Sequence, residues 1–169
     1  MFTIQLARPS DVGRFAAIEL AAARLLIGHA PESILTESTH PDALHAAQAQ
    51  GRLWVALEED VPVGFAIVEM LADGMPHLNE IDVHPDHGRR GIGAALVRTI
   101  CAWAVKGGYE ELTLTTFRSV PWNMPFYSRM GFEEIPPAEL SPELLEVIRD
   151  ETARGLDPAA RVAMRYRCP

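Results

Sequence analysis

Residues 77–97 read HLNEIDVHPDHGRRGIGAALV, and this stretch decides the fold. A run of alternating apolar residues predicts a strand that ends at Val83, and a helical pattern begins after Gly93. Between them lie Gly88 and Gly91, and such glycines let a ligand approach the backbone closely. The first amides of a helix have no partners inside the helix and lie at the positive end of its dipole. The stretch therefore predicts an anion site of the kind that holds a pyrophosphate.

The residues around these glycines exclude two familiar classes of phosphate-binding loop. A dinucleotide-binding fingerprint requires a third glycine at the position that Leu96 occupies. A nucleoside-triphosphate loop requires Gly-Lys followed by Ser or Thr, where this chain has Ile92-Gly93-Ala94. On the local pattern alone, a plain turn followed by a helix start stays open as the alternative to an anion site.

Outward from this stretch, the chain alternates between strand and helix patterns without a repeat or a long linker. Predicted strands cover residues 2–6, 52–57, 61–71, 77–83, 112–114 and 161–167. Predicted helices cover residues 9–26, 41–50, 94–106, 121–130 and 141–154. We expect a single domain over residues 1–169 with an α/β fold on a mixed sheet, because the strands do not recur as repeated strand–helix–strand units.

Composition and charge narrow the classes of function. Asp and Glu outnumber Lys and Arg by 23 to 15, and this net charge of −8 disfavours nucleic acid as a partner. No apolar run approaches the roughly 20 residues of a membrane span, so no membrane partner is expected. The first residues lack a basic segment followed by an apolar one, which predicts a cytoplasmic protein. Cys101 and Cys168 form neither a disulfide framework nor a zinc-binding spacing.

Two motifs, in this order, resemble those of the GCN5-related N-acetyltransferase (GNAT) superfamily. The family's first motif runs from Val-x-Pro to Gln/Arg-x-x-Gly-x-Gly/Ala. This chain has Val83-His84-Pro85, followed by GRRGIG at residues 88–93. The family's second motif, Phe-Tyr-x-x-x-Gly-Phe, is matched within NMPFYSRMGF at residues 123–132.

Two positions depart from the family's pattern. Gly88 stands where the family has Gln or Arg. Because such a loop binds phosphate largely through backbone amides, we expect the site to survive, with nearby charge from Arg89 or Arg90. Val120 stands where many members carry an Asn seven residues before the tyrosine, which puts that polar contact in question.

The resemblance implies an acyl-CoA N-acyltransferase fold, in which helices flank a mixed, mostly antiparallel central sheet. It implies an enzyme that moves an acetyl group from acetyl-CoA to a primary amine of a small molecule or peptide, directly in a ternary complex and without a metal.

In the family the strand before the loop bulges away from its neighbour, and pantetheine pairs with the exposed backbone much like an added strand. The cofactor-binding residues carried over are Ile81, Asp82, Val83, Gly88, Arg89, Arg90, Gly91, Ile92, Gly93, Ala94, Asn123, Phe126 and Tyr127. The identity of the amine stays open, as does a homodimer.

Acetyl transfer requires a base that deprotonates the amine and an acid that protonates the leaving thiolate. Tyr127 matches the family's tyrosine near the sulfur and is expected to be the acid, its alternative being a core aromatic role. His77 is the first candidate for the base, because it falls where the aralkylamine branch has a His and because the ordinary pKa of histidine is about 6.5. Glu80 comes second, since strict alternation puts it on the opposite side of the strand unless a bulge intervenes. Asp82 and ordered water are the remaining candidates.

A second class of function stays open, that of a non-catalytic module that binds acyl-CoA as a sensor or regulator. Tyr127 together with a candidate base favours the enzyme. His84 and His87 lie beside the glycine loop and are expected to be solvated or to contact the cofactor. The family builds its acceptor pocket from the first helices and the loops at strand ends, so residues 28–37 and 117–122 are the expected walls.

Overall fold

A computed structural model describes all 169 residues of the chain. Seven strands form one sheet in the order β1-β2-β3-β4-β5-β7-β6. Their bounds are β1 (Phe2–Leu6), β2 (Leu53–Glu58), β3 (Val61–Met70), β4 (Pro76–Val83), β5 (Glu111–Phe117), β6 (Glu133–Glu134) and β7 (Arg161–Arg167). All neighbouring strands are antiparallel except β4 and β5, which are parallel. The expected mixed, mostly antiparallel sheet is therefore confirmed.

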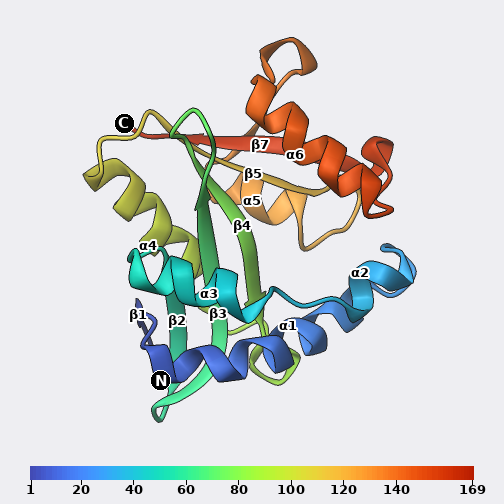
Figure 1. Ribbon diagram of the computed structural model, residues 1–169. Helices are drawn as coiled ribbons and strands as arrows, with labels where there is room; N and C mark the ends of the chain where they lie inside the picture. The colour runs from blue at the N-terminus through green and yellow to red at the C-terminus, as the bar shows by residue number, and fades with distance from the viewer.

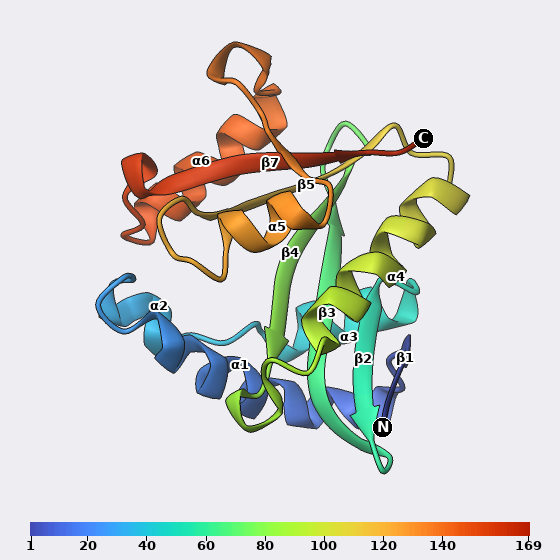
Figure 2. The ribbon, with the colours of Figure 1, turned by 180° about the vertical axis from the view of Figure 1, so that it is seen from behind.

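Helices cover both faces of this sheet. They are α1 (Phe15–Ala23), α2 (Glu32–Thr36), α3 (Pro41–Ala49), α4 (Ile92–Lys106), α5 (Met124–Arg129) and α6 (Pro142–Ala153). Figure 1 shows α1, α3 and α6 in front of the sheet, and Figure 2, seen from behind, shows α4 and α5 on the opposite face. The longest helix has 15 residues, and none of the helices combines the length and the apolar character needed to cross a membrane.

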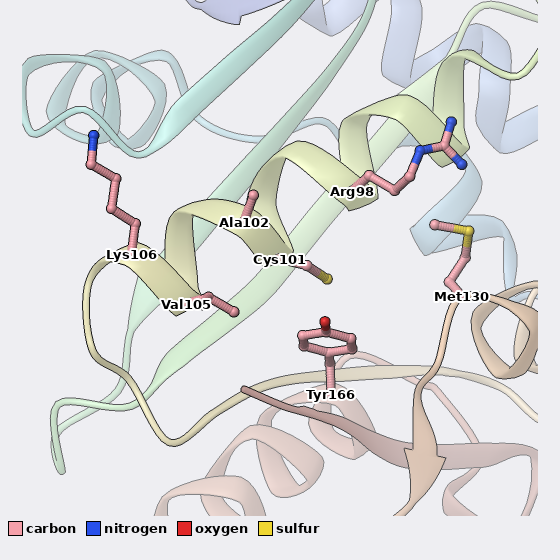
Figure 3. Close-up of a pocket in the computed structure, with 7 residues that line it drawn as sticks. All are labelled: Arg98, Cys101, Ala102, Val105, Lys106, Met130 and Tyr166. Atoms are coloured by element: carbon pink, nitrogen blue, oxygen red, sulfur yellow. The ribbon is translucent and has the colours of Figure 1, made fainter. Parts of the chain in front are cut away.

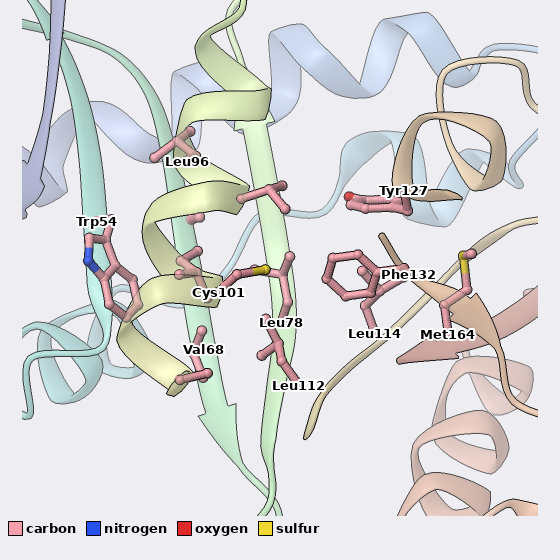
Figure 4. Packing of buried hydrophobic residues seen from close by; sticks show 14 of the residues in the cluster. Trp54, Val68, Leu78, Leu96, Cys101, Leu112, Leu114, Tyr127, Phe132 and Met164 are labelled. Carbon is pink, nitrogen blue, oxygen red and sulfur yellow. The ribbon is translucent and has the colours of Figure 1, made fainter. Parts of the chain in front are cut away.

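Two hydrophobic clusters fill the space between the sheet and its helices, because the side chains of a strand point alternately to its two faces. In β3, Phe65 and Ile67 belong to the cluster beneath α1 and α3, whereas Ala66 and Val68 belong to the cluster beneath α4. Phe65 stacks on Phe15 of α1 with ring centroids 4.5 Å apart. Figure 4 shows the cluster beneath α4. Burying one large apolar side chain contributes roughly 1.5–3 kcal/mol, so the two clusters hold the central strands firmly between them.

The sheet divides next to β4. Strands β4 and β5 are paired at only one position, His77 opposite Thr113, and beyond it they diverge (Figures 1 and 2). The edge of β4 that faces β5 is therefore unpaired from residue 78 to residue 83. An unpaired edge presents backbone N–H and C=O groups that an extended ligand can pair with.

The predicted strands and helices are all found, with differences at their ends. The first helix is interrupted, since Pro9–Arg14 forms a 3₁₀ helix and α1 begins at Phe15. Among the strands and α-helices, two were not predicted, α2 and the two-residue strand β6. Both are too short to show a periodic pattern of apolar residues, which is the main signal for secondary structure in a sequence.

Candidate active site

The loop between β4 and α4 presents a row of free backbone amides. The N–H groups of residues 89–94 donate to no backbone carbonyl of the protein. Gly91 precedes the first residue of α4 and has a left-handed backbone, with φ of 82°. The amide of Gly88, expected to belong to this row, instead donates to the carbonyl oxygen of Pro85 at 3.0 Å. Six successive free donors at the start of a long helix are suited to bind an anion.

The two arginines of the loop lie in different surroundings. Arg89 is exposed and has a φ of 60°. The guanidinium of Arg90 is bound to the carboxylate of Glu58, with Nη1 donating to Oε2 at 3.0 Å. At the start of α4, a Cβ added to Gly93 would lie 3.9 Å from the ring of Phe126, so the glycine leaves an open position beside an aromatic side chain.

A β-bulge decides which way the acidic residues of β4 point. Val68 of β3 lies opposite Leu78, and the next pair joins Ile67 to Glu80, so Asn79 is the extra residue. A bulge of this kind resets the alternation of side chains along the strand. The bulge that was needed to turn Glu80 toward the side of His77 is thereby found.

Beyond the bulge, the side chains of β4 separate into an apolar and an acidic set. Ile81 and Val83 pack against the cluster beneath α4. Glu80 and Asp82 point to the other face, where they meet Glu19 of α1. One carboxylate oxygen from each of these three residues lies within 4.8 Å of the others. Oxygens this close can share a proton or hold a cation.

The surroundings raise the pKa of both carboxyl groups on β4. Burial is the main cause for Glu80, whose pKa rises to about 7, and the neighbouring charge of Glu19 adds to it. Burial also raises the pKa of Asp82 well above its ordinary value, followed by the charge of Glu80. The Oδ2 atom of Asp82 is buried and has no hydrogen-bond partner. Because two adjacent carboxylates resist ionising together, this pair retains a proton near neutral pH.

His77 lies at the closed end of the split. Its side chain is 1% exposed, and Nδ1 lies 2.9 Å from Oγ1 of Thr113 on β5. Burial lowers the pKa of His77 to about 4, so the ring is neutral at physiological pH. The structure thus places the first candidate for the base within the core, where it joins β4 to β5.

Tyr127 lies on α5, with its ring between two other aromatic rings. The ring centroids of Phe126 and Phe132 lie 5.1 and 5.7 Å from that of Tyr127. Its hydroxyl points toward β4 (Figure 4). Burial, and then the charges of Glu80 and Asp82, raise the pKa of Tyr127 above its ordinary value. The hydroxyl therefore stays protonated and is suited to donate a proton or a hydrogen bond.

Two further residues are Asn123, in the second motif, and Val120, which precedes the motif. Asn123 lies at the start of α5 and accepts the amide hydrogen of Tyr127 on its backbone carbonyl at 3.0 Å. Val120, at the position where relatives of this pattern carry an Asn, is 2% exposed and packs with Phe117 and Leu156. An apolar side chain fills this space, so no polar contact arises from that position.

The two segments expected to form the acceptor pocket do meet in the structure. Leu26, Ala30 and Ile34, around the connection from α1 to α2, pack against the small cluster that contains Phe117. His29 and Trp122 lie edge to face, with ring centroids 6.0 Å apart. The two segments therefore form one surface on the side of the sheet to which the acidic residues of β4 point.

A separate pocket of about 470 Å³ opens between α4 and β7. Its lining is Arg98, Cys101, Ala102, Val105, Lys106, Met130 and Tyr166. Figure 3 shows the hydroxyl of Tyr166 pointing toward the side chain of Cys101. Burial raises the pKa of Cys101 to about 12, so the thiol is protonated at neutral pH and is not a nucleophile. Cys101 is therefore a small buried residue of the core.

Two residues of the site region were not found from the sequence, Glu19 and Glu58. Glu19 is the only charged residue of α1, and its position beside Glu80 follows only from the packing of that helix across β4. Glu58 lies at the end of β2, 29 residues before His87 in the chain and in contact with it. An isolated acidic residue carries no local signal, so neither position could be identified without the fold.

A sheet that splits between two parallel strands, with an anion-binding loop beside the split, defines the class of acyl-CoA N-acyltransferase folds. The chain belongs to the acetyltransferase (GNAT) family, whose model matches residues 21–132.

Relatives and solved structures agree with this assignment. Mycothiol acetyltransferase of Nocardiopsis dassonvillei is 34% identical over 155 residues, covering 76% of this chain and 45% of the relative. Human N-acetyltransferase 8 is 28% identical over 136 residues, covering 76% of this chain and 59% of the relative. The chain therefore spans about half the length of the curated relatives it matches.

Two solved structures have the same fold at low sequence identity. The PaiA N-acetyltransferase from Thermoplasma acidophilum in complex with coenzyme A has a TM-score of 0.75 at 15% identity, with 99% of both chains covered. N-acetylglutamate synthase from Neisseria gonorrhoeae, complexed with coenzyme A and N-acetyl-glutamate, has a TM-score of 0.74 at 16% identity. This match covers 100% of this chain and 35% of the synthase. At these identities the likeness shows the fold alone.

Proposed function

We propose that this protein is an enzyme that transfers an acetyl group from acetyl-CoA to a primary amine of a small molecule or peptide, directly in a ternary complex. The observation that carries the proposal is the row of six free amides, residues 89–94, at the mouth of the split between β4 and β5. Two curated relatives, mycothiol acetyltransferase and N-acetyltransferase 8, support the same reaction class. The presence of coenzyme A in two structures of the same fold supports the donor.

The residues of the donor site fit the chemistry of coenzyme A. Its pyrophosphate is an anion suited to the amides of residues 89–94, with added charge from the exposed Arg89. Its pantetheine arm is an extended chain with amide groups, and it would pair with the unpaired edge of β4 at residues 81–83. Gly93 keeps the position beside Phe126 open, because a side chain there would occupy the space next to the ring.

For the base we propose Glu80, acting together with Asp82, in place of His77. The amine attacks the thioester carbonyl only as the free base, so the ammonium must first lose a proton. The pKa of Glu80 is raised to about 7 and that of Asp82 well above its ordinary value, and both residues lie on the acceptor side, whereas His77 is enclosed in the core. A carboxylate of this pair takes the proton from the ammonium. The nitrogen then bonds to the acetyl carbon, the carbon–sulfur bond breaks, and Tyr127 gives its proton to the departing thiolate. The second proton that the nitrogen loses as the neutral amide forms restores the Tyr127 hydroxyl.

Release of free thiol from acetyl-CoA in the presence of a panel of primary amines tests the reaction. We expect thiol release that depends on one class of amine, together with an acceptor heavier by one acetyl group. A protein that binds coenzyme A tightly and releases no thiol with any amine would instead be the non-catalytic sensor. Absence of coenzyme A binding would refute both functions.

Three variants separate the candidates for the base. Glu80→Gln keeps the size of the side chain but removes the base, so we expect turnover to fall by about 10²–10⁴-fold with little change in CoA affinity. His77→Gln is expected to retain most of the turnover of the molecules that remain folded. Glu69→Gln, at an exposed position of β3, is the matched control. If His77→Gln abolished turnover in folded protein while Glu80→Gln did not, the histidine would be the base.

A further inference from the structure

An acidic side chain of β2 binds two side chains of the loop between β4 and α4, here called the donor loop. Glu58, the last residue of β2, is only 14% exposed. Its Oε2 atom accepts hydrogen bonds from Nδ1 of His87 at 2.5 Å and from Nη1 of Arg90 at 3.0 Å. Its Oε1 atom accepts a second bond from Arg90, so the guanidinium is held in the bidentate manner that fixes orientation as well as distance.

A carboxylate at this position is unfavourable for binding a pyrophosphate, which indicates that Glu58 has a structural role. A negative charge beside a site for a pyrophosphate repels the ligand. The hydrogen bonds from Arg90, and then the one from His87, lower the pKa of Glu58, so the carboxylate is ionised at neutral pH. It also pairs with Arg90, one of the two arginines of the loop, whereas Arg89 is exposed and has no acidic partner.

Few backbone hydrogen bonds hold the loop in place, so its conformation depends on side-chain contacts. Before the loop, the amide of His84 donates to the carbonyl of Val63 at 2.9 Å, and the amide of Gly88 closes a turn on Pro85. After it, the carbonyl of Gly91 accepts the first bond of α4. Between these points, residues 89–90 make no backbone hydrogen bond at all. Of the two side chains that Glu58 binds, that of His87 precedes this unsupported stretch and that of Arg90 belongs to it.

We propose that Glu58 is a positioning residue for the donor site, which clamps the loop through His87 and Arg90 and leaves Arg89 as the arginine that meets the phosphates. The inference rests on the proposed binding of coenzyme A at residues 89–94. By holding the loop in one conformation, the clamp keeps the free amides directed at one point before the ligand arrives. A ligand that finds its donors already placed loses less conformational entropy on binding.

A competing role for Glu58 predicts the opposite result. The three clamp residues line a hollow of about 480 Å³ between the β2–β3 hairpin and the loop, so Arg90 has room to move when released. If Glu58 only neutralised Arg90, its removal would free a second arginine for the phosphates and would tighten the binding of coenzyme A. If Glu58 positions the loop, its removal weakens binding.

Calorimetry of coenzyme A, together with steady-state kinetics, distinguishes the two roles. We expect Glu58→Gln and Arg90→Gln each to weaken coenzyme A binding by about tenfold and to raise KM for acetyl-CoA, with kcat within about twofold of the unmodified protein. Because both variants break the same interaction, the double variant should bind coenzyme A no more weakly than either single variant.

Arg90→Lys keeps the charge but loses the bidentate geometry, so its binding of coenzyme A should remain weakened. Arg89→Gln should weaken binding separately, and its effect should multiply with that of Glu58→Gln.

The controls separate failure of this proposal from failure of the proposed function. Glu69→Gln is the matched substitution on the neighbouring strand and should bind coenzyme A normally. Thermal melting reports whether each variant is folded, and if Glu58→Gln is not, Arg90→Gln at an exposed position carries the test. Unchanged or tighter binding of coenzyme A in Glu58→Gln or Arg90→Gln overturns the clamp. So does a double variant of Glu58→Gln and Arg90→Gln in which the two losses of affinity multiply fully. Failure of the unmodified protein to bind coenzyme A overturns the donor site itself.

Discussion

The donor side and the acceptor side of this molecule are built in different ways. The donor side lies within one continuous stretch, β4, the loop and the start of α4, and it works mainly through backbone amides. The acceptor side brings together Glu19 of α1, Glu80 and Asp82 of β4, and two surface segments that are about 90 residues apart in the chain. A site made of backbone can be identified from the glycines that it requires, whereas a site made of distant side chains depends on the fold. Four variants test how far this division holds.

The largest effect on coenzyme A affinity is expected at the loop. Gly91→Glu puts a side chain and a negative charge among the amides that would hold the pyrophosphate, so coenzyme A affinity should fall by about 100-fold or more. The matched control is Gly74→Glu, in the turn between β3 and β4, because Gly74 has a φ of 83° and Gly91 one of 82°. Both substitutions impose the same backbone strain, but only the first reaches the loop. Calorimetry that finds equal losses of affinity in the two variants would remove the loop from the donor site.

A somewhat smaller effect is expected where the two sides meet, at Tyr127. Tyr127→Phe removes the proton donor for the leaving thiolate, and kcat should fall by about 10²-fold with CoA affinity almost unchanged. Tyr166→Phe is the matched control, because Tyr166 lines the separate pocket between α4 and β7. Turnover of Tyr127→Phe equal to that of the control would leave the residue with a packing role only.

A third effect, on stability instead of catalysis, is expected at His77. Replacing His77 by Gln disturbs a buried contact with Thr113, and about 2 kcal/mol of unfolding free energy should be lost at pH 7. The folded pKa of about 4 lies below the ordinary value of about 6.5, so the contribution of the neutral ring is present above pH 6.5. It is lost as pH falls toward 4.

Urea unfolding at pH 7 and pH 4.5 tests this pH dependence. The difference in stability between the unmodified protein and His77→Gln should shrink at the lower pH. The raised pKa values of Glu80 and Asp82 act in the opposite direction, but they are common to both proteins and cancel in the difference. A difference that stays constant between the two pH values would contradict the buried, neutral state of His77.

The smallest effect is expected at Glu19, whose charge raises the pKa of both Glu80 and Asp82. Glu19→Gln removes that charge, so the acidic limb of the rate profile should move to lower pH by less than about one unit. Glu32→Gln, exposed on α2, is the control and should leave the limb in place. A shift to higher pH in Glu19→Gln would show that the three carboxylates do not interact as the structure indicates.

The sequence predicted the order of the elements and the loop because both leave local signals. The glycines at 88, 91 and 93 and the proline at 85 marked the loop, and the periodic apolar residues marked α4. The ranking of the bases could not be predicted in the same way. Strict alternation separated His77 from Glu80, and only the bulge at Asn79, which depends on pairing with β3, put them on the same side. The burial of His77 depends in turn on Thr113, 36 residues further along the chain.

The pH dependence of kcat, compared between the unmodified protein and Glu80→Gln, tests the central claim most directly. The acceptor should be a saturating amine whose own pKa lies above about 9, so that its titration does not overlap that of the carboxylates. The Glu80–Asp82 pair acts as a base only after losing its proton, and burial raises the pKa of Glu80 to about 7, so kcat should rise with pH through the neutral range. In Glu80→Gln this limb should disappear and kcat should fall by about 10²–10⁴-fold. An unchanged limb and an unchanged kcat in Glu80→Gln would contradict the account.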